Sequence, residues 1–193
     1  MKKQPEITER TRQNLIDAFW LLYCEKRIDK ITIKEITDKA GYNRGTFYEY
    51  FSDVYDVLEQ IENSLLPGNI DEMPPRTIPS PELSFPVNAF VKMYEEHSKY
   101  YVVLLGDNGD PSFQSKMKNR LKPLLLQVLG GTKGIEDFRI DYTIEYMLSA
   151  MIGVLSYWFR QEKRPPIHEL INLMYDIVTN DRILKIFDFA GKN

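Results

Sequence analysis

The chain has 193 residues, of which 43% are hydrophobic and 27% charged, and this composition excludes a disordered or fibrous protein. The net charge of −3 is unevenly spread, because residues 1–50 hold ten Lys or Arg against eight Asp or Glu and the remainder carries a net −5. The only cysteine, Cys24, excludes an internal disulfide and a cysteine-based metal cluster, and we expect it to pack in a core as a small apolar side chain.

The N-terminal segment indicates no leader peptide and predicts an amphipathic helix. Residues 1–5 are basic but are followed by polar residues rather than by an apolar stretch, so no signal peptide is indicated and we expect a cytoplasmic protein. Apolar residues then recur at helical spacing over residues 8–25, which predicts an amphipathic helix.

Two short helices follow, with a glycine between them. Thr32 and Glu35 form a capping box, in which the side chain of each accepts a hydrogen bond from the backbone amide of the other. Gly41 ends this helix because glycine adopts a left-handed conformation without steric cost, and Asn43 is a good cap for a third helix that reaches about Tyr48. These are the parts of a helix-turn-helix, whose second helix enters the major groove of DNA.

The side chains of this segment suit contact with DNA. Arg44 can donate two parallel hydrogen bonds to guanine or bind a phosphate, and Gly45 lets the backbone approach the duplex closely. Thr46 offers a methyl group and a hydroxyl to base edges, while Lys30 and Lys34 add electrostatic attraction. A basic first segment before an acidic remainder agrees with this role.

One run of residues resembles the recognition-helix signature of the TetR family: Ala40-Gly41-Tyr42-Asn43-Arg44-Gly45-Thr46-Phe47-Tyr48-Glu49-Tyr50-Phe51-Ser52. The similarity covers residues 8–66. It implies a ligand-responsive repressor that binds palindromic operator DNA as a homodimer and is released by a small-molecule effector. It also implies that the hydroxyls of Thr32, Tyr48 and Tyr50 bind phosphate oxygens.

We also expect contacts with DNA at the turn before the third helix and consider the start of a fourth helix as a phosphate site. For Tyr42 and Asn43 we favour contact with DNA over structural capping. Ser52 and Asp53 can cap a fourth helix. The TetR family usually has Lys where this chain has Val54, so the resemblance implies that one phosphate contact is missing there. The amides at the start of that helix can still attract a phosphate.

A proline-rich connector divides the chain. Five of the eleven prolines lie between Pro67 and Pro81, and no regular element survives that density of proline. We therefore expect a DNA-binding domain over residues 1–66, a connector over residues 67–81, and an effector-binding and dimerisation domain over residues 82–193.

The second domain is predicted to be helical, which gives an all-α fold of about nine helices in the whole chain. The stretch Leu104–Phe113 also resembles a ligand-domain segment of one TetR subgroup. The helices of this domain are expected over residues 83–94, 101–105, 112–129, 138–162 and 166–179.

The last two helices carry more apolar surface than one chain is expected to bury. The uncharged stretch Tyr146–Phe159 has 14 residues, too few to span a membrane, and predicts a helix that is buried on two sides. We expect a two-fold, four-helix interface between two copies of the chain, and ordinary intramolecular core is the alternative. The expected interface residues are Ser149, Gly153, Ser156, Tyr157, Ile167, Leu170, Ile171, Met174, Ile177 and Val178.

A small molecule of unidentified chemistry is expected to bind inside the second domain. Aromatic and Met side chains are candidates for lining its pocket, although most of them are expected to be core, and His97 can supply a polar group. The candidates are Tyr94, His97, Tyr101, Phe113, Tyr142, Tyr146, Met147 and Met151.

Catalysis has little support in the sequence. No nucleophile, zinc or phosphate-loop motif occurs, and the acidic residues near Asp110 are too few for a calcium loop. We expect no catalytic residue, metal, cofactor or membrane contact. One alternative remains open, because the negative net charge and Val54 also suit a helical module that binds protein instead of DNA.

Overall fold

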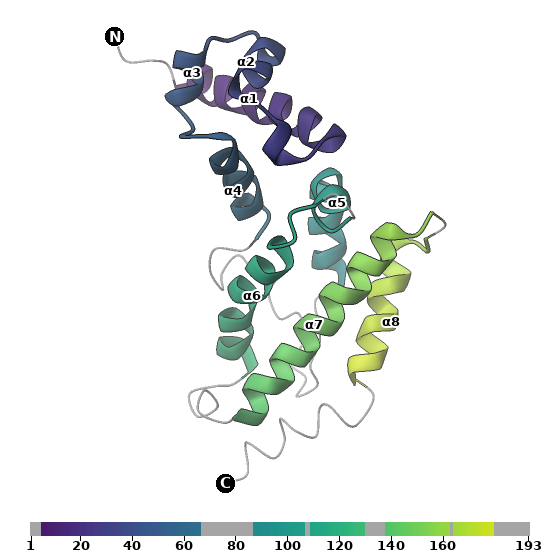
Figure 1. Ribbon diagram of the computed structural model, residues 1–193. Helices are drawn as coiled ribbons and strands as arrows, with labels where there is room; N and C mark the ends of the chain where they lie inside the picture. Colours follow the sequence, from purple (N-terminus) through teal and green to yellow (C-terminus); the bar gives the residue numbers. More distant parts are fainter. Residues whose placement is uncertain (1–4, 67–86, 107–108, 130–137, 163, 180–193) are drawn as a thin grey trace. The chain divides into compact units, whose positions relative to one another are not determined.

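The computed structural model describes residues 5–66, 87–106, 109–129, 138–162 and 164–179 (Figure 1). The chain divides into two compact units, Met1–Leu65 and Leu66–Asn193. Helices are the only regular elements in the described ranges, so the all-α expectation is confirmed. None of the helices in these ranges is both long enough and apolar enough to cross a membrane. The expected connector over residues 67–81 lies outside the described residues.

The N-terminal unit is built on α1, which packs against α2 and α4, while α2 packs against α3. Apolar side chains from all four helices meet in one core, and Leu15, Phe19, Ile36, Phe47 and Val57 have no exposed surface. Burial of such side chains is the main source of stability in a unit of this size. Its helices are α1 (Pro5–Glu25), α2 (Ile33–Ala40), α3 (Arg44–Tyr48) and α4 (Val54–Ser64), with a short 3₁₀ turn at Ile28–Lys30.

Cys24 is exposed, so the expectation that it packs in the core is wrong. The buried face of α1 near its C-terminus is occupied by the aromatic residues Phe19, Trp20 and Tyr23. The Tyr23 ring stacks on that of Phe19 at 5.6 Å and lies tilted against that of Trp20 at 5.5 Å. At about 100° per residue, Cys24 lies about 140° around the helix from Phe19, beyond Trp20, and therefore falls outside the buried face.

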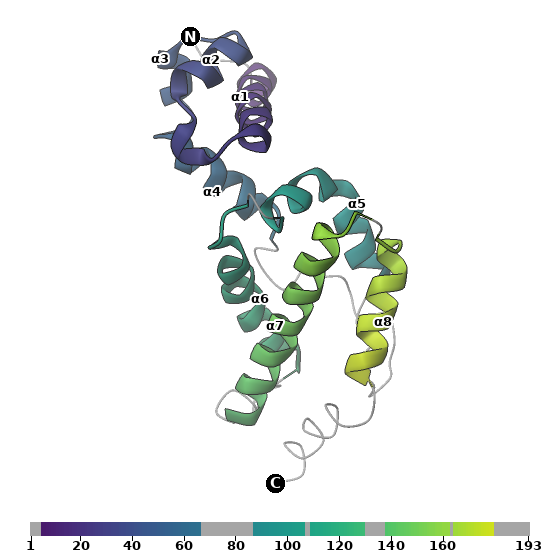
Figure 2. The ribbon, with the colours of Figure 1, turned by 45° about the vertical axis from the view of Figure 1, so that its right-hand side comes forward.

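The C-terminal unit consists of α5 (Val87–Leu104), α6 (Phe113–Leu129), α7 (Phe138–Arg160) and α8 (Ile167–Thr179). α6 packs against α7 and α5 against α8. Figures 1 and 2 both show α7, in green, running between α6 and α8. The fully buried face of α7, which includes Ile140, Ile144 and Leu148, packs against three leucines of α6.

α5 is a single helix, whereas the sequence predicted two helices over residues 83–94 and 101–105. The polar residues between these two ranges interrupt the apolar pattern, but they contain no helix breaker, and the helix continues through them. The fusion leaves eight α-helices in the described residues, close to the nine that were expected.

The turn from α5 to α6 is closed by two glycines and one aspartate. A Cβ at Gly106 would lie 2.6 Å from the Val102 carbonyl oxygen, and a Cβ at Gly109 would collide with the Leu104 carbonyl. Asp110 accepts hydrogen bonds from the amide and the hydroxyl of Ser112, at 2.8 and 2.6 Å. The glycines therefore let two stretches of backbone approach more closely than any side chain would allow.

Candidate nucleic-acid interface

α3 is positioned by a cap that its own sequence supplies. The Oδ1 atom of Asn43 accepts hydrogen bonds from the Thr46 amide at 2.9 Å and from the Thr46 hydroxyl at 3.3 Å. A Cβ at Gly45 would lie 3.1 Å from that same oxygen, so glycine leaves room for the cap. Asn43 therefore caps α3, a structural role that the sequence analysis favoured less than contact with DNA. The Thr46 hydroxyl already makes a hydrogen bond inside the protein.

Tyr42 is likewise held by the fold. Its amide donates to the Thr37 carbonyl at 2.9 Å, across the left-handed Gly41, whose φ is 76°. Its hydroxyl accepts a hydrogen bond from the Asn14 amide group at 3.0 Å. This hydrogen bond from α1 lowers the pKa of Tyr42 below its ordinary value. Tyr42 thus ties the turn between α2 and α3 to α1.

The start of α2 shows the predicted capping box. The Thr32 amide donates to Glu35 at 3.0 Å, and the Glu35 amide donates to the Thr32 hydroxyl at 3.3 Å. The Thr32 hydroxyl donates to the same carboxylate at 2.9 Å, so its hydrogen is already used inside the protein. Lys26 lies against the other carboxylate oxygen, at 2.6 Å.

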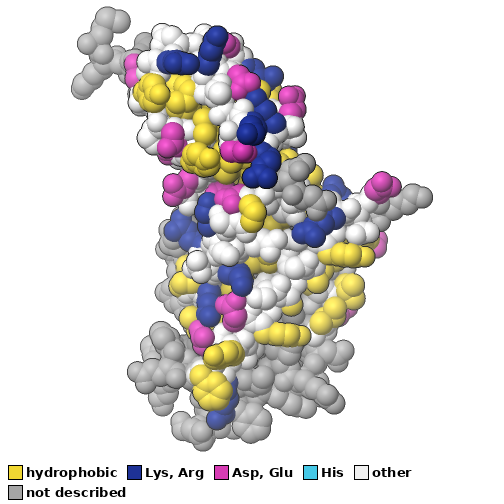
Figure 3. All heavy atoms as spheres, in the orientation of Figure 1, with side chains coloured by type: hydrophobic (Ala, Val, Ile, Leu, Met, Phe, Trp, Pro, Cys, Tyr) yellow, Lys and Arg dark blue, Asp and Glu magenta, His cyan; other side chains and the backbone are white. Residues whose placement is uncertain are grey.

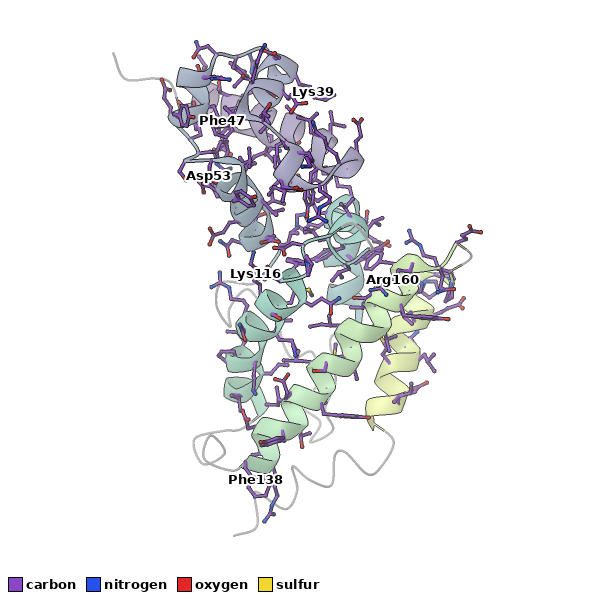
Figure 4. The ribbon with its side chains drawn as sticks, viewed as in Figure 1. Lys39, Phe47, Asp53, Lys116, Phe138 and Arg160 are labelled. Atoms are coloured by element: carbon purple, nitrogen blue, oxygen red, sulfur yellow. The ribbon has the colours of Figure 1, made fainter. Side chains whose placement is uncertain are left out.

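Three cations on α2 and α3 are exposed and make no hydrogen bond or ion pair with any described residue: Lys34, Lys39 and Arg44. Figure 3 shows Lys and Arg side chains, mixed with Asp and Glu, at the top and along the right-hand side of this unit. In Figure 4 Lys39 points away from the helices, whereas Phe47 of α3 points into them. Lys30 is less available, because its ammonium lies 3.5 Å from Asp29. Tyr48 is exposed and Tyr50 half-buried.

A polar network joins α1 and α4 to the segment that leaves α3. Arg12 donates to Gln60 at 2.6 Å, and Gln60 donates to Asp56 at 2.9 Å. Asp56 accepts from the amide and the hydroxyl of Ser52, at 2.8 and 3.1 Å. Burial raises the pKa of Asp56, but these hydrogen bonds from Ser52 and Gln60 outweigh it and lower the pKa overall. The chain after α3 is therefore fixed to α4 by a charged anchor.

The candidate effector residues do not all face the interior of the C-terminal unit. Tyr101, Phe113 and Met147 are buried, and Tyr94, His97 and Met151 are half-buried. Tyr142 and Tyr146, by contrast, are 71% and 63% exposed.

Tyr94 packs in an aromatic cluster at one end of this unit. Its ring centre lies 5.6 Å from that of Trp158 and 5.8 Å from that of Phe159. The Arg164 guanidinium lies 4.4 Å from the centre of the Trp158 ring. The Trp158 indole donates to the Pro165 carbonyl at 2.8 Å, so the cluster fastens the turn between α7 and α8.

The candidate interface residues fall into two groups. Ser156 is buried and accepts a hydrogen bond from Gln114 of α6 at 3.1 Å. Exposed members are Ser149, Gly153, Tyr157 and Ile177, and Val178 lies outside the residues whose side chains are described. The apolar stripe of α8 that the sequence analysis assigned to the interface is buried within the chain itself: Ile167, Leu170, Ile171 and Met174.

Comparison with known proteins agrees with the sequence signature and the fold. Residues 86–180 match a family model described as TetR_C_8, transcriptional regulator C-terminal region. Over 69 residues the chain is 33% identical to the HTH-type transcriptional regulator YvdT of Bacillus subtilis strain 168, and this match spans 36% of each protein. The chain belongs to the TetR family of transcriptional regulators. The members of this family regulate transcription and are not enzymes.

Solved structures share the fold of this TetR-family chain. A TetR regulator from Streptococcus agalactiae 2603V has a TM-score of 0.62 at 20% identity, and the match covers 91% of this chain and 97% of that one. The fatty acid degradation regulator FadR of Bacillus halodurans has a TM-score of 0.62 at 19% identity, with 94% and 98% covered. The dihydroxyacetone kinase operon activator DhaS has a TM-score of 0.59 at 16% identity, with 93% and 97% covered.

The start of α4 differs from the family pattern in a way that the structure explains. Val54 is only 9% exposed and joins the buried stripe of Val57, Leu58 and Ile61. The Asp53 carboxylate accepts hydrogen bonds from the next amides of the helix, at 2.8 and 2.9 Å. The expectation that these amides attract a phosphate is therefore wrong, because a carboxylate already occupies them.

We expect Val54→Lys to destabilise the N-terminal unit by about 1 to 2 kcal/mol, because the substitution removes a buried apolar side chain and places an ammonium at its position. Tyr55→Lys is the matched control, since Tyr55 is the next residue and is 55% exposed. Urea denaturation measures the free energy of unfolding of both variants. Equal stability of the two variants would show that position 54 is not part of the core.

Proposed function

We propose that this protein is a ligand-responsive repressor that binds palindromic operator DNA as a homodimer and leaves the DNA when a small molecule binds. The observation that carries the proposal is the exposed Arg44 on the first turn of α3, which, like the exposed Lys34 and Lys39 of α2, has no partner in the described part of the chain. A helix-turn-helix places its second helix in the major groove and its first helix across the backbone. Arg44 then reads a base, and the two lysines bind phosphates.

The structure supports a narrower set of DNA contacts than the sequence analysis named. Tyr42 and Asn43 hold the turn and the cap of α3, and the hydroxyls of Thr32 and Thr46 already make hydrogen bonds inside the protein. Tyr48, which is 59% exposed, keeps its hydroxyl available for a phosphate. Gly45 contributes by leaving space for the cap and for a close approach of the backbone.

Pairing of two chains is supported by the exposed face of α7. Tyr142, Tyr146, Gly153 and Tyr157 lie on this face, and Figure 3 shows hydrophobic side chains along α7. Their spacing places all four within one side of the helix. The edge of α8 adds two exposed apolar residues, Leu173 and Ile177. Leu173 was missed in the sequence, although its spacing of four residues from Ile177 could have identified it. A second copy of the chain would bury this surface.

The first test is selection of binding sites from random duplex DNA with the full-length protein, followed by affinity measurements on the recovered duplex. We expect Arg44→Ala to lose about 1 to 3 kcal/mol of binding free energy on that duplex, because a two-pronged contact to guanine contributes this much discrimination. Arg120→Ala removes an exposed arginine from α6 and is the control. Unchanged affinity in a folded Arg44→Ala variant would remove Arg44 from the site.

The second test concerns the effector. A library of small apolar and aromatic molecules is screened by thermal shift, and each binder is then added to the protein on its selected duplex. We expect binders that also weaken DNA binding, because a ligand shifts the equilibrium only through its different affinity for the two states. Transcription from a promoter carrying the duplex should rise with such a ligand. A fall would make the protein an activator, as the name of DhaS describes that neighbour.

A further inference from the structure

We propose that Lys26 is a positioning residue for DNA binding, which keeps the start of α2 compatible with phosphate by neutralising the Glu35 carboxylate. The inference rests on the DNA binding proposed above. Lys26 follows directly after α1, and its ammonium crosses to Glu35 in the first turn of α2. No contact of Lys26 with DNA is needed for this role, since it acts through Glu35.

The carboxylate of Glu35 is fixed in place by donors on both of its oxygens. Oε1 lies 2.6 Å from the Lys26 ammonium, and Oε2 accepts from the amide and the hydroxyl of Thr32 at 3.0 and 2.9 Å. Hydrogen bonds from Lys26 and Thr32 hold the pKa of Glu35 at about 2, so the group stays ionised at neutral pH. A permanent negative charge therefore sits at the helix end that crosses the DNA backbone.

This charge conflicts with phosphate binding. The N-terminus of a helix attracts anions through its amides and its dipole, and an acidic capping residue cancels that attraction. The Thr32 hydroxyl cannot compensate, because its only hydrogen is donated to Glu35. The Lys26 ammonium restores neutrality directly at the carboxylate, where its effect on a nearby phosphate is largest.

The experiment measures affinity for two duplexes, the one recovered by selection and an unrelated duplex of the same length, at several salt concentrations. Lys26→Met should weaken binding to both duplexes about tenfold at low salt, since two copies of Glu35 then repel the backbone of one DNA. The loss should shrink as salt rises, because screening weakens the repulsion. Lys26→Arg keeps the charge and should bind as the wild type does.

The decisive variant is Lys26→Met combined with Glu35→Gln. Glutamine preserves the capping box, so the double variant lacks only the two charges and should regain affinity to within about twofold of the wild type. A purely structural role for Lys26 predicts the opposite, namely that the double variant binds as weakly as Lys26→Met. That result, or unchanged affinity in Lys26→Met itself, would overturn the inference.

The chain offers a closely matched control in its C-terminal unit. Lys118 and Glu145 are 2.8 Å apart and 30% and 39% exposed, against 30% and 42% for Lys26 and Glu35. Lys118→Met thus removes the same charge from an ion pair of similar exposure, in which Glu145 keeps Lys122 as a second partner at 3.3 Å, and should leave DNA affinity unchanged. An equal loss in this variant would make the effect one of net charge and overturn the inference. Failure of the wild type to bind either duplex would instead overturn the proposed function.

Discussion

The Gly153→Glu variant should be a monomer at micromolar concentration and should lose most of its affinity for operator DNA. Gly153 is exposed on α7, and a Cβ built there meets no atom within 4 Å in its own chain. A glutamate therefore fits the isolated subunit, and it is a better helix former than glycine. In a paired α7 the same carboxylate would be buried without a partner, which costs several kcal/mol. Monomers would bind two half-sites independently and weakly.

Light scattering measures the mass, and urea denaturation shows whether the subunit stays folded. Two controls separate charge from position. Asn119→Glu adds the same group to an exposed position of α6, and Gly153→Ala changes position 153 without a charge. Both should scatter as the wild type does. A dimeric Gly153→Glu protein would show that the exposed face of α7 is not where two chains meet.

The Gly109→Ala variant should lose about 3 kcal/mol of stability, the upper end of the usual cost of overpacking. The added methyl group would collide with the Leu104 carbonyl, which is backbone and cannot rotate away as a side chain can. Leu104 itself is buried, as are its neighbour Leu105 and Phe113 at the start of α6. The collision can therefore be relieved only by moving the packed ends of two helices.

Gly153→Ala is again the control, because the same substitution in open space should be neutral or stabilise the helix by about 0.5 to 1 kcal/mol. Urea denaturation of the two alanine variants therefore gives changes of opposite sign. The prediction would be wrong if both variants had the same midpoint. Hydrogen exchange should locate the loss in the amides of α5 and α6.

The elements that the sequence predicts well are those decided by neighbouring residues. The capping box at Thr32 and the Asn43 cap depend on atoms three residues apart, so they follow from sequence alone. The length of α5 was misjudged because polar residues 95–100 interrupted its apolar pattern, although none of them breaks a helix.

The identity of the partner of an apolar stripe cannot be predicted from its spacing. Ile171 and Met174 are as regularly spaced as any interface stripe, yet α8 packs them inside its own chain. Tyr146 appeared to be a pocket residue because aromatic residues are usually buried, yet it lies exposed on α7. Val54 and Tyr55 are neighbours that lie on different sides of α4, and Val54 is buried while Tyr55 is exposed.

The chain contains two tryptophans, and the fold assigns one to each unit. Trp20 lies among the aromatic residues of α1, and Trp158 lies beneath Arg164 with its indole nitrogen bonded to Pro165. Both are 5% exposed, so the emission of each shifts to longer wavelength only when its own surroundings open to water. Replacing Trp20 by Phe leaves Trp158, at the turn between α7 and α8, as the single tryptophan. The tryptophan emission of this variant then follows the melting of the second unit and the arrival of a ligand there, while the matching Trp158→Phe variant follows the melting of the first unit in an equally intact protein.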